Sequence, residues 1–367
     1  LLSYIKKYFV NISKLSKIYI KIYEIKWYEK FNMTKIFITG IAGFIGSHLS
    51  RIYASNENKI GGCDNLAGGY SDNIDDRAEF HQVDCNYLNA LNNITKGYDH
   101  IFHTACYPHE GLSVFSPHLV CNNLINASTS IFSAVANNKV KRVYNFSSMA
   151  RYGDNSVPFT EDQTPNPKDP YGIAKVAAED IMKILSDVHE FEYVNFVPHN
   201  VIGPYQKYDD PFRNVVAIMI NRMLSGKQPY IYGDGSSKRC FSDIRDLYNV
   251  FNKIIDADNV HGETFNIGPD EEPISIVDLA ELIAETLNFS NFDPIFAKDR
   301  PQEVKEAFCS SDKIRKFFDY KTKYKLKDSI KFMADWISQR GTKKFKYHLN
   351  LDIKSEKIPE TWNEKLL

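Results

Sequence analysis

The chain has 367 residues, with 45 Lys and Arg against 46 Asp and Glu and a formal net charge of −1. No basic stripe stands out in the body of the chain, which argues against nucleic acid as a main partner, and no apolar run approaches the roughly eighteen residues that span a bilayer. The length suits one large domain or two closely packed ones.

Six cysteines are scattered along the chain without a CxxC pair, and four of them lie inside apolar segments. This pattern predicts buried, reduced thiols rather than disulfides or a zinc site, so no metal is expected. A cytoplasmic protein without a membrane partner is therefore the prediction. The cysteines are Cys63, Cys85, Cys106, Cys121, Cys240 and Cys309.

Residues 1–33 precede the first predicted strand and are not expected to be part of the fold. The stretch does not begin with Met, and the first Met is Met33, so we interpret it as a non-native or upstream extension. It is rich in Ile, Tyr and Lys, a composition that could also form a basic amphipathic helix for a membrane surface or a partner.

From residue 34 onward, apolar runs typical of strands alternate with helical patterns. This alternation predicts an α/β fold of the Rossmann type, a doubly wound parallel sheet with helices on both faces. Pro/Gly-rich turns after about residue 200 predict a smaller substrate-binding region over the carboxyl ends of the strands. The expected boundaries are 34–200 for the sheet, 201–340 mainly for the smaller region and 341–367 for a C-terminal tail. The expected strands are 35–39, 59–63, 79–83, 99–103, 141–147 and 193–197, and the expected helices lie near 44–55, 118–138 and 171–188.

Three glycines, Gly40, Gly43 and Gly46, recur at three-residue intervals directly after the first predicted strand. The first two let the backbone approach an anion at a helix N-terminus, and Gly46 lets the helix pack close to the strand. A dinucleotide pyrophosphate fits such a site. Asp64 ends the second strand, where its carboxylate can accept hydrogen bonds from a ribose diol and repel a 2′-phosphate, so the sequence favours NAD over NADP.

Other predicted strands also end in residues that suit a cofactor. Asp84 ends the third run, where it could lie near an adenine ring or cap a helix or turn. The fourth run, which includes His103, is followed by Thr104 and Ala105, and larger side chains there would block a cofactor lying across the strand ends.

Tyr171 and Lys175 stand four residues apart at the start of a predicted helix, so their side chains share one face. A nearby ammonium favours the phenolate and lowers a tyrosine pKa from about 10 toward neutrality, which predicts that Tyr171 can act as a base. Ser147 and Ser148 end the preceding strand and could bind a substrate oxygen. Alone, such a pair usually caps or turns the chain; with Tyr171 and Lys175 it completes a Ser/Tyr/Lys group.

With these residues in place, the chain resembles an extended short-chain dehydrogenase/reductase of the NAD-dependent sugar-nucleotide epimerase/dehydratase family. The resemblance covers about residues 34–340. Its motifs are Gly40-x-x-Gly43-x-x-Gly46, Asp64-Asn65-Leu66, His103-Thr104-Ala105, Ser147-Ser148-x-x-x-Tyr152-Gly153, Tyr171-x-x-x-Lys175, Asn200-Val201-x-Gly203-Pro204, Tyr232-Gly233-Asp234-Gly235-x-x-x-Arg239, Phe265-Asn266-Ile267-Gly268 and Asp299-Arg300-Pro301.

The resemblance implies a role for each site residue. Ser148, four residues before the Tyr-Gly pair, is the catalytic hydroxyl, Tyr171 is the base, and Lys175 holds the nicotinamide ribose and tunes Tyr171. Asn200, Asn214, Arg239 and Arg300 are expected to hold a nucleotide diphosphate, since arginine binds phosphates bidentately. The full cofactor set is Gly40, Gly43, Phe44, Ile45, Gly46, Asp64, Asn65, Asp84, Cys85, His103, Ala105, Asn123, Ser147, Tyr171, Lys175 and Pro198. The full substrate set is Tyr107, His109, Ser148, Met149, Asn200, Asn214, Arg239, Arg300 and Ala307.

The two residues after Ser148 distinguish between members of the family. Dehydratases of the group carry acids there and a 3,5-epimerase would carry a cysteine at the second position, whereas this chain has Met149 and Ala150. A nucleotide-sugar 4-epimerase, acting through a transient 4-keto sugar, is therefore the prediction. A 4-ketohexose reductase or dehydrogenase is the alternative, and a 4,6-dehydratase or a non-catalytic NAD-binding protein is disfavoured.

Three positions differ from the family pattern. Arg151 stands where a small or branched apolar residue is usual, and His109 lies in an unusual loop where it could bind the hexose or face solvent. Asn123 is one residue out of the usual register after Pro117.

The resemblance also bears on the sugar and on assembly. Ala307, seven residues after Arg300, corresponds to a position where tyrosine restricts related 4-epimerases to plain hexoses, so a small residue there predicts tolerance of an N-acetyl group. The family pairs two long helices across a two-fold axis, which predicts a homodimer through 118–138 and 171–188. The apolar positions considered for that interface are Leu119, Leu124, Ile131, Val135, Ile181 and Leu185.

Overall fold

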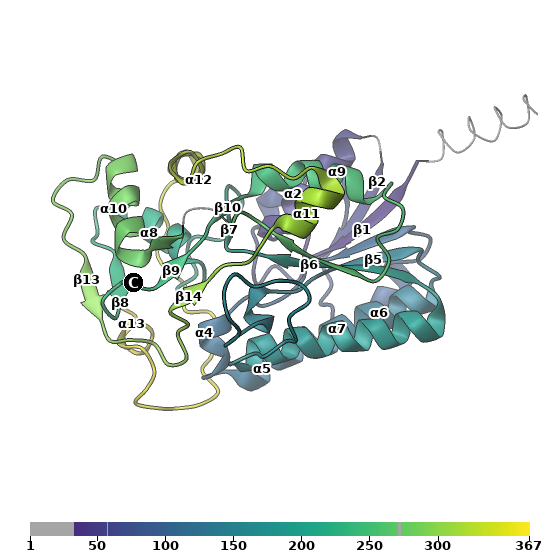
Figure 1. Cartoon of the computed structure of the whole chain (residues 1–367), viewed down its shortest axis with the longest axis horizontal. Helices are drawn as coiled ribbons and strands as arrows, with labels where there is room; N and C mark the ends of the chain where they lie inside the picture. The colour runs from purple at the N-terminus through teal and green to yellow at the C-terminus, as the bar shows by residue number, and fades with distance from the viewer. Residues whose placement is uncertain (1–32, 57, 271–272) are drawn as a thin grey trace, which may run out of the picture.

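The computed structural model describes residues 33–56, 58–270 and 273–367, so the predictions for residues 1–32 lie outside the described residues. Its central layer is a seven-stranded parallel sheet in the order β11-β6-β5-β4-β1-β2-β3 (Figure 1). The strands are β1 (Lys35–Thr39), β2 (Lys59–Cys63), β3 (Glu79–His81), β4 (His100–His103), β5 (Arg142–Phe146), β6 (Glu192–Pro198) and β11 (Glu263–Ile267).

The strands are apolar because both faces of the sheet are covered. β1 and β2 each have four consecutive buried residues, and all five residues of β5 are buried. Continuous burial of this kind is typical of parallel sheets between two helical layers. The six predicted strands and the doubly wound fold are thus confirmed, although β3 ends at His81 rather than at residue 83.

Two layers of helices cover the sheet (Figure 1). α2 (Phe44–Ser55), α9 (Tyr248–Ile254) and α11 (Asp312–Phe318) pack on one face, and α3 (Leu88–Ile94), α6 (Ala127–Asn137) and α7 (Pro170–His189) pack on the other. The helices predicted near 44–55, 118–138 and 171–188 are confirmed, and the second of them is a continuous helical segment of α5 (Pro117–Cys121), a π-turn and α6.

This segment, Pro117–Asn137, has the length and mean hydropathy of a membrane span, which the sequence analysis did not anticipate, and half of it is buried in the fold. Its residues Ile131, Phe132 and Val135 are fully buried beside α7 and the sheet. The apolar composition is therefore accounted for by core packing.

The smaller region follows β6. Among its described residues it contains three short sheets and three helices of at least 10 residues, with a core of their own. β11, α9 and α11 nevertheless come from this part of the chain and return to the main sheet, so the two regions are interleaved. The predicted boundaries at residues 200 and 340 stay predictions. The elements are α8 (Val215–Leu224), α10 (Ile276–Thr286), α12 (Leu326–Arg340), β7 (Val201–Ile202) with β10 (Ser242–Asp243), β8 (Tyr230–Tyr232) with β13 (Ile295–Ala297), and β12 (Ile274–Ser275), β9 (Lys238–Arg239) and β14 (Glu306–Ala307) in one sheet.

The long helix α7 lies on the outside of its layer (Figure 1). Ile173, Ile184 and Val188 are each more than half exposed, and their spacing places them on one stripe of this helix. In contrast, Leu124, Ile131 and Val135, which the sequence offered as interface positions, are buried within this chain. We propose that the exposed stripe on α7 contributes to the predicted homodimer.

Light scattering tests this assembly. The wild-type protein should have twice the 42.2 kDa mass of one chain at micromolar concentration, and Ile184→Asp combined with Val188→Asp should give the monomer, because a charge at each position would be buried at the interface. Ile295→Asp, the same change on exposed β13, is the control and should leave the dimer intact. A wild-type monomer would contradict the proposal.

Candidate active site

Two cavities lie at the carboxyl ends of the strands. The first, here called the strand-end cavity, has a volume of about 280 Å³ and lies over β1, β2, β4 and β5. The second, here called the arginine cavity, has a volume of about 340 Å³ and lies in the smaller region. The two cavities adjoin, because they share five lining residues: Pro108, Glu110, Asn200, Gln206 and Arg213.

The glycine turn forms one corner of the strand-end cavity. Gly40 has a φ of +72°, and a Cβ atom there would lie 2.8 Å from the backbone nitrogen of Ala105, so only glycine fits. Gly43 caps the start of α2 without a side-chain hydrogen bond, which leaves backbone N–H groups available at the positive end of the helix. The corner is suited to bind an anion.

Acidic and amide side chains continue the wall from β2 and β3. Asp64 is buried, and its carboxylate accepts hydrogen bonds from the N–H of Ala42 at 3.1 Å and of Leu66 at 2.7 Å. Burial raises the pKa of Asp64, and these backbone donors oppose the rise. Asn65 donates to Asp84 at 2.7 Å, and Cys85, beside Asp84, also lines the cavity.

Most of the remaining predicted cofactor residues line the same cavity. Asn123 is among them despite its shifted register, and its side chain donates to the carbonyl of Leu119 at 2.9 Å. The others are Phe44, Ile45, Ala105, Ser147, Tyr171, Lys175 and Pro198.

Two predicted cofactor residues, Gly46 and His103, do not line the cavity. A Cβ atom on Gly46 would lie 2.2 Å from the carbonyl oxygen of Gly40, so this glycine allows α2 to pack against the turn. His103 is buried beneath the strand end, where its ring nitrogens lie 2.9 Å from the Thr39 hydroxyl and 3.0 Å from the Ser128 hydroxyl. Burial lowers the pKa of His103 to about 3, so the ring is neutral and structural. The packing role predicted for Gly46 therefore agrees with the structure, and neither residue lines the cavity that the other predicted cofactor residues share.

The predicted Ser/Tyr/Lys group is brought together in the strand-end cavity. α7 starts at an N-cap, Asp169, whose carboxylate accepts from the N–H of Gly172 at 2.8 Å, and this places Tyr171 and Lys175 in the first turns of the helix. The Lys175 ammonium donates to the carbonyl of Phe146 at 2.7 Å and lies 5.8 Å from the ring centroid of Tyr171. Ser148 follows β5 and accepts from the N–H of Ala150 at 3.2 Å.

The pKa of Tyr171 does not follow the sequence prediction. Burial raises this pKa well above its ordinary value, with a further contribution from Cys106, and a hydrogen bond with Ser148 opposes the rise. Removal of the phenol from water therefore decides the direction of the shift, and the predicted lowering of the pKa is not seen in this structure.

Arg151, which departs from the family pattern, forms a buried ion pair. Its Nη2 atom lies 3.0 Å from Oε2 of Glu179 on α7, and its guanidinium lies 4.9 Å from the ring centroid of Tyr152. The other carboxylate oxygen of Glu179 accepts from the hydroxyl of Ser147. This ion pair therefore fixes the loop that carries Ser148 against the helix that carries Tyr171 and Lys175.

Two arginines converge in the arginine cavity. The Nη2 atom of Arg239 lies 3.1 Å from one carboxylate oxygen of Glu303, and that of Arg300 lies 2.6 Å from the other. Paired guanidinium groups of this kind suit the two charges of a diphosphate.

The other predicted substrate residues of this cavity lie around the arginine pair. Asn214 caps α8 by accepting from the N–H of Val216 at 3.0 Å, and Asn200 donates to the carbonyl of Cys240 at 3.0 Å. Ala307 pairs with Arg239 across β14 and β9, is buried, and lines the cavity, as does Met149.

Tyr107 and His109 belong to one loop but differ in position. Tyr107 lines the strand-end cavity together with Ser148 and Tyr171, so its predicted contact with the substrate stays a prediction. His109 lines neither cavity and does not face solvent, because it is buried with its Nε2 atom 3.1 Å from the carboxylate of Asp210. Both readings offered for His109 are therefore wrong.

Two residues that line both cavities, Arg213 and Gln206, were not among the site residues predicted from the sequence. The Nη2 atom of Arg213 donates to the carbonyl of Gly68 at 2.7 Å, which connects the smaller region to the loop after β2, and both side chains line both cavities. The position of Arg213 directly before the predicted ligand Asn214 was the available signal.

Comparisons with known proteins agree with the fold. Residues 36–268 match the NAD-dependent epimerase/dehydratase family. A provisionally named UDP-glucose 4-epimerase of Methanocaldococcus jannaschii is 30% identical over 311 residues, which cover 83% of this chain and 99% of that protein. GDP-mannose 3,5-epimerase 1 of Oryza sativa subsp. japonica is 27% identical over 316 residues, covering 83% of this chain and 82% of that protein. The structure of UDP-glucuronic acid 4-epimerase from Bacillus cereus, in complex with UDP-glucuronic acid and NAD, has a TM-score of 0.76 at 26% identity and covers 84% of this chain and 100% of that chain.

Removal of the Asp64 carboxylate tests whether this residue sets the predicted preference for NAD over NADP. Asp64→Ala should weaken NAD binding by ~10- to 100-fold, the usual effect of losing hydrogen bonds to a charged group, and should reduce discrimination against NADP. Calorimetric titration with both dinucleotides measures the two effects. Asp76→Ala, on an exposed carboxylate, is the control, and a wild-type preference for NADP would show that this role of Asp64 is incorrect.

Proposed function

We propose that this chain, which belongs to the NAD-dependent epimerase/dehydratase family, is a nucleotide-sugar 4-epimerase of the UDP-hexose or UDP-N-acetylhexosamine type. The observation that carries the proposal is the junction of the two cavities. Ser148, Tyr171 and Lys175 line the strand-end cavity, and the arginine pair lines the cavity that adjoins it. A sugar joined to a diphosphate can therefore reach both groups.

The residues of the strand-end cavity fit NAD, the cofactor of this family. The turn at Gly40 has no room for a side chain, the backbone N–H groups at the start of α2 are available, and Ala105 is small. We expect the pyrophosphate at this turn, the adenosine ribose at Asp64, and the nicotinamide ribose at Tyr171 and Lys175. When bound, NAD supplies reversible hydride transfer.

The side chains of the chain itself handle the proton. Tyr171 would take the proton from the sugar 4-hydroxyl as the 4-keto sugar forms and return it when the sugar is reduced on its other face. Ser148 would hold the same oxygen by a hydrogen bond, and Lys175 would favour the phenolate electrostatically. The reaction has no net redox change.

Competing reactions of the family are disfavoured by the residues that adjoin Ser148. Met149 and Ala150 line the arginine cavity, and neither side chain can transfer a proton. Elimination of the C6 hydroxyl and inversion at C3 or C5 both require an acid or base on the sugar, so oxidation and re-reduction at one carbinol fits these two residues better.

The experiment that tests this function also tests the base. Wild type and Tyr171→Phe are incubated with UDP-, GDP-, CDP- and dTDP-sugars without added cofactor, and products are separated by chromatography. Wild type should convert at least one sugar to its 4-epimer. Tyr171→Phe should lose at least ~100-fold in turnover while retaining bound NAD, because proton abstraction is lost and the pyrophosphate turn is unchanged.

The matched control is Tyr87→Phe, since Tyr87 is an exposed tyrosine outside both cavities. More than about a tenth of wild-type turnover in Tyr171→Phe would exclude it as the base. Oxidation of a sugar to its 4-keto form, with one equivalent of added NAD reduced for each sugar oxidised, would identify a 4-ketohexose reductase or dehydrogenase. No conversion of any sugar would favour a non-catalytic protein.

The sugar site is expected to tolerate a bulky 2-substituent. Ala307 is buried in the wall of the arginine cavity and packs with Tyr152, Phe159 and Cys309. The methyl group of Ala307 leaves space that the phenol of a tyrosine would fill. A cavity wall excludes a substituent that clashes with it more strongly than it excludes a smaller substituent that leaves a gap. We therefore propose that 2-acetamido sugars are accepted.

Enlarging this position should separate the two sugar classes. Ala307→Tyr should abolish turnover of the N-acetylhexosamine nucleotide and spare the plain hexose, measured as kcat/KM for each. Ala307→Gly, which enlarges the space instead, should keep both activities. Equal loss on both sugars in Ala307→Tyr would mean that Ala307 does not lie beside the sugar.

A further inference from the structure

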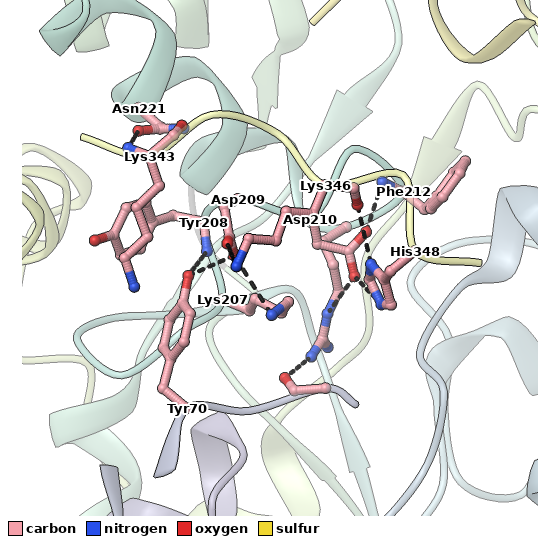
Figure 2. Close-up of polar contacts among 12 residues, drawn as sticks. Tyr70, Lys207, Tyr208, Asp209, Asp210, Phe212, Asn221, Lys343, Lys346 and His348 are labelled. Carbon is pink, nitrogen blue, oxygen red and sulfur yellow. Dashed lines mark hydrogen bonds and ion pairs between the residues drawn. The ribbon is translucent and has the colours of Figure 1, made fainter. Parts of the chain in front are cut away.

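The segment after α12, residues 342–367, is here called the strap, and it lies outside the residues that match the family. It returns across the smaller region, forms the short helix α13 (Glu360–Asn363) and ends beside β8 (Figure 1). Its first attachment is polar. Figure 2 shows Lys346 and His348 of the strap beside Asp209 and Asp210, two carboxylates that are fully buried. The backbone N–H of Lys346 donates to the carbonyl of Asp209 at 2.8 Å, and Nε2 of His348 lies 3.9 Å from the Asp210 carboxylate.

The Asp210 carboxylate also holds residues of the catalytic region. It contacts His109 at 3.1 Å and Arg213 at 3.7 Å, and Arg213 lines both cavities. Burial alone would raise the pKa of Asp210, but the hydrogen bond and charge of His109, together with Arg213, lower it to about 2, so the carboxylate stays ionised. The strap is thus attached to the same charge that orients a cavity residue.

The second attachment is apolar. Trp362 and four partly buried residues of the strap pack against Leu112, Phe115 and Phe212, of which the first lies on α4 (Glu110–Ser113). The four residues are Tyr347, Leu349, Leu351 and Ile358.

The end of the strap reaches the wall of the arginine cavity. Thr361 shares a hydrogen bond of 2.5 Å with the hydroxyl of Tyr232, and the Tyr347 hydroxyl joins the Thr361 carbonyl at 2.8 Å to the N–H of Leu367 at 3.2 Å. Leu367 and Tyr232 both line the cavity, so the strap contributes directly to its surface.

A series of contacts connects the region near Ser148 to this wall. Met149 packs against the cluster that includes Ala307, Ala307 pairs with Arg239, and Glu303 joins Arg239 to Arg300. Met149 and Ala150, next to Ser148, mark the end where the sugar would react. The arginine pair comes next, and the guanidinium of Arg300 lies 4.8 Å from the ring centroid of Tyr232. In a nucleotide sugar the diphosphate separates sugar from nucleoside, so the nucleoside would extend past the arginines toward Tyr232 and Leu367.

We propose that the strap is a specificity element of the substrate site and that Leu367, with Tyr232 held by Thr361, forms the wall against the nucleoside. The inference rests on the proposed binding of a nucleotide sugar. It does not depend on which reaction the sugar undergoes, because the nucleoside is held apart from the reacting carbon.

Calorimetric titration of the 367-residue, NAD-loaded chain with UDP, CDP, dTDP and GDP tests the proposal. The nucleotide that binds wild type most tightly is the probe. Leu367→Ala, which removes apolar contact, and Thr361→Val, which frees the Tyr232 hydroxyl, should each raise the Kd of the probe at least ~5-fold. The amount of bound NAD should not fall in either variant, which checks that each protein is folded.

Leu349→Ala is the matched control, since it makes the same change on the strap in a residue that does not line the cavity. It should lower the melting temperature without changing the Kd of the probe. An unchanged Kd in both Leu367→Ala and Thr361→Val, or an equal rise in Leu349→Ala, would overturn the proposal and leave the proposed function intact.

The opposite result is also distinguishable. The wild-type protein could bind a nucleotide tightly, and the two strap variants could weaken that binding, while no sugar is converted. This result would support the strap proposal and overturn the epimerase proposal. If the wild-type protein bound none of the four nucleotides, both the strap proposal and the epimerase proposal would be overturned.

Discussion

The Asp64 carboxylate joins the end of β2 to the turn between β1 and α2 through its hydrogen bonds with the N–H groups of Ala42 and Leu66. A carboxylate removed from water needs such donors, so the two loops are constrained to close around it. The turn is equally constrained on its other side, where Gly40 approaches Ala105. The N-terminus of α2 is consequently aimed into the strand-end cavity, and the other elements of the site are arranged against this corner.

A second constraint connects Ser148 to Tyr171. These residues come from different elements, and the ion pair of Arg151 with Glu179 joins those elements inside the protein. Buried charges are costly unless they are paired and hydrogen-bonded, so small shifts that separate this pair are disfavoured. Lys175 contributes in the same way, because its ammonium is held by the carbonyl at the end of β5.

The parts of the fold and site that could be predicted from the sequence are those that depend on residues close together along the chain. Strands appear as apolar runs because the sheet is covered on both faces, and Tyr171 with Lys175 appears as a four-residue interval. The position of His103 was not predicted because the sequence does not say on which side of the strand its ring lies; the ring reaches Ser128 beneath the cavity. The pKa of Tyr171 was misjudged because the neighbouring lysine is visible in the sequence and the burial is not.

Other features could not be predicted because they depend on contacts between distant segments. The partner of His109 is Asp210, 101 residues further along the chain, and no pattern near His109 indicates this pairing. The strap carries no motif at all, and its contribution to the arginine cavity results from attachments to three separate parts of the fold.

In the arginine cavity, the charged side chains and the apolar wall come from different segments of the chain. Glu303 contacts both Arg239 and Arg300, so two like charges that would repel each other are held side by side. A diphosphate that enters the cavity meets two side chains already in place, and less rotamer freedom has to be lost on binding. This part of recognition is electrostatic and should weaken with added salt. The wall formed by Leu367 is apolar and should not respond to salt in that way, so the salt dependence of nucleotide binding would separate the contribution of the arginines from that of the strap.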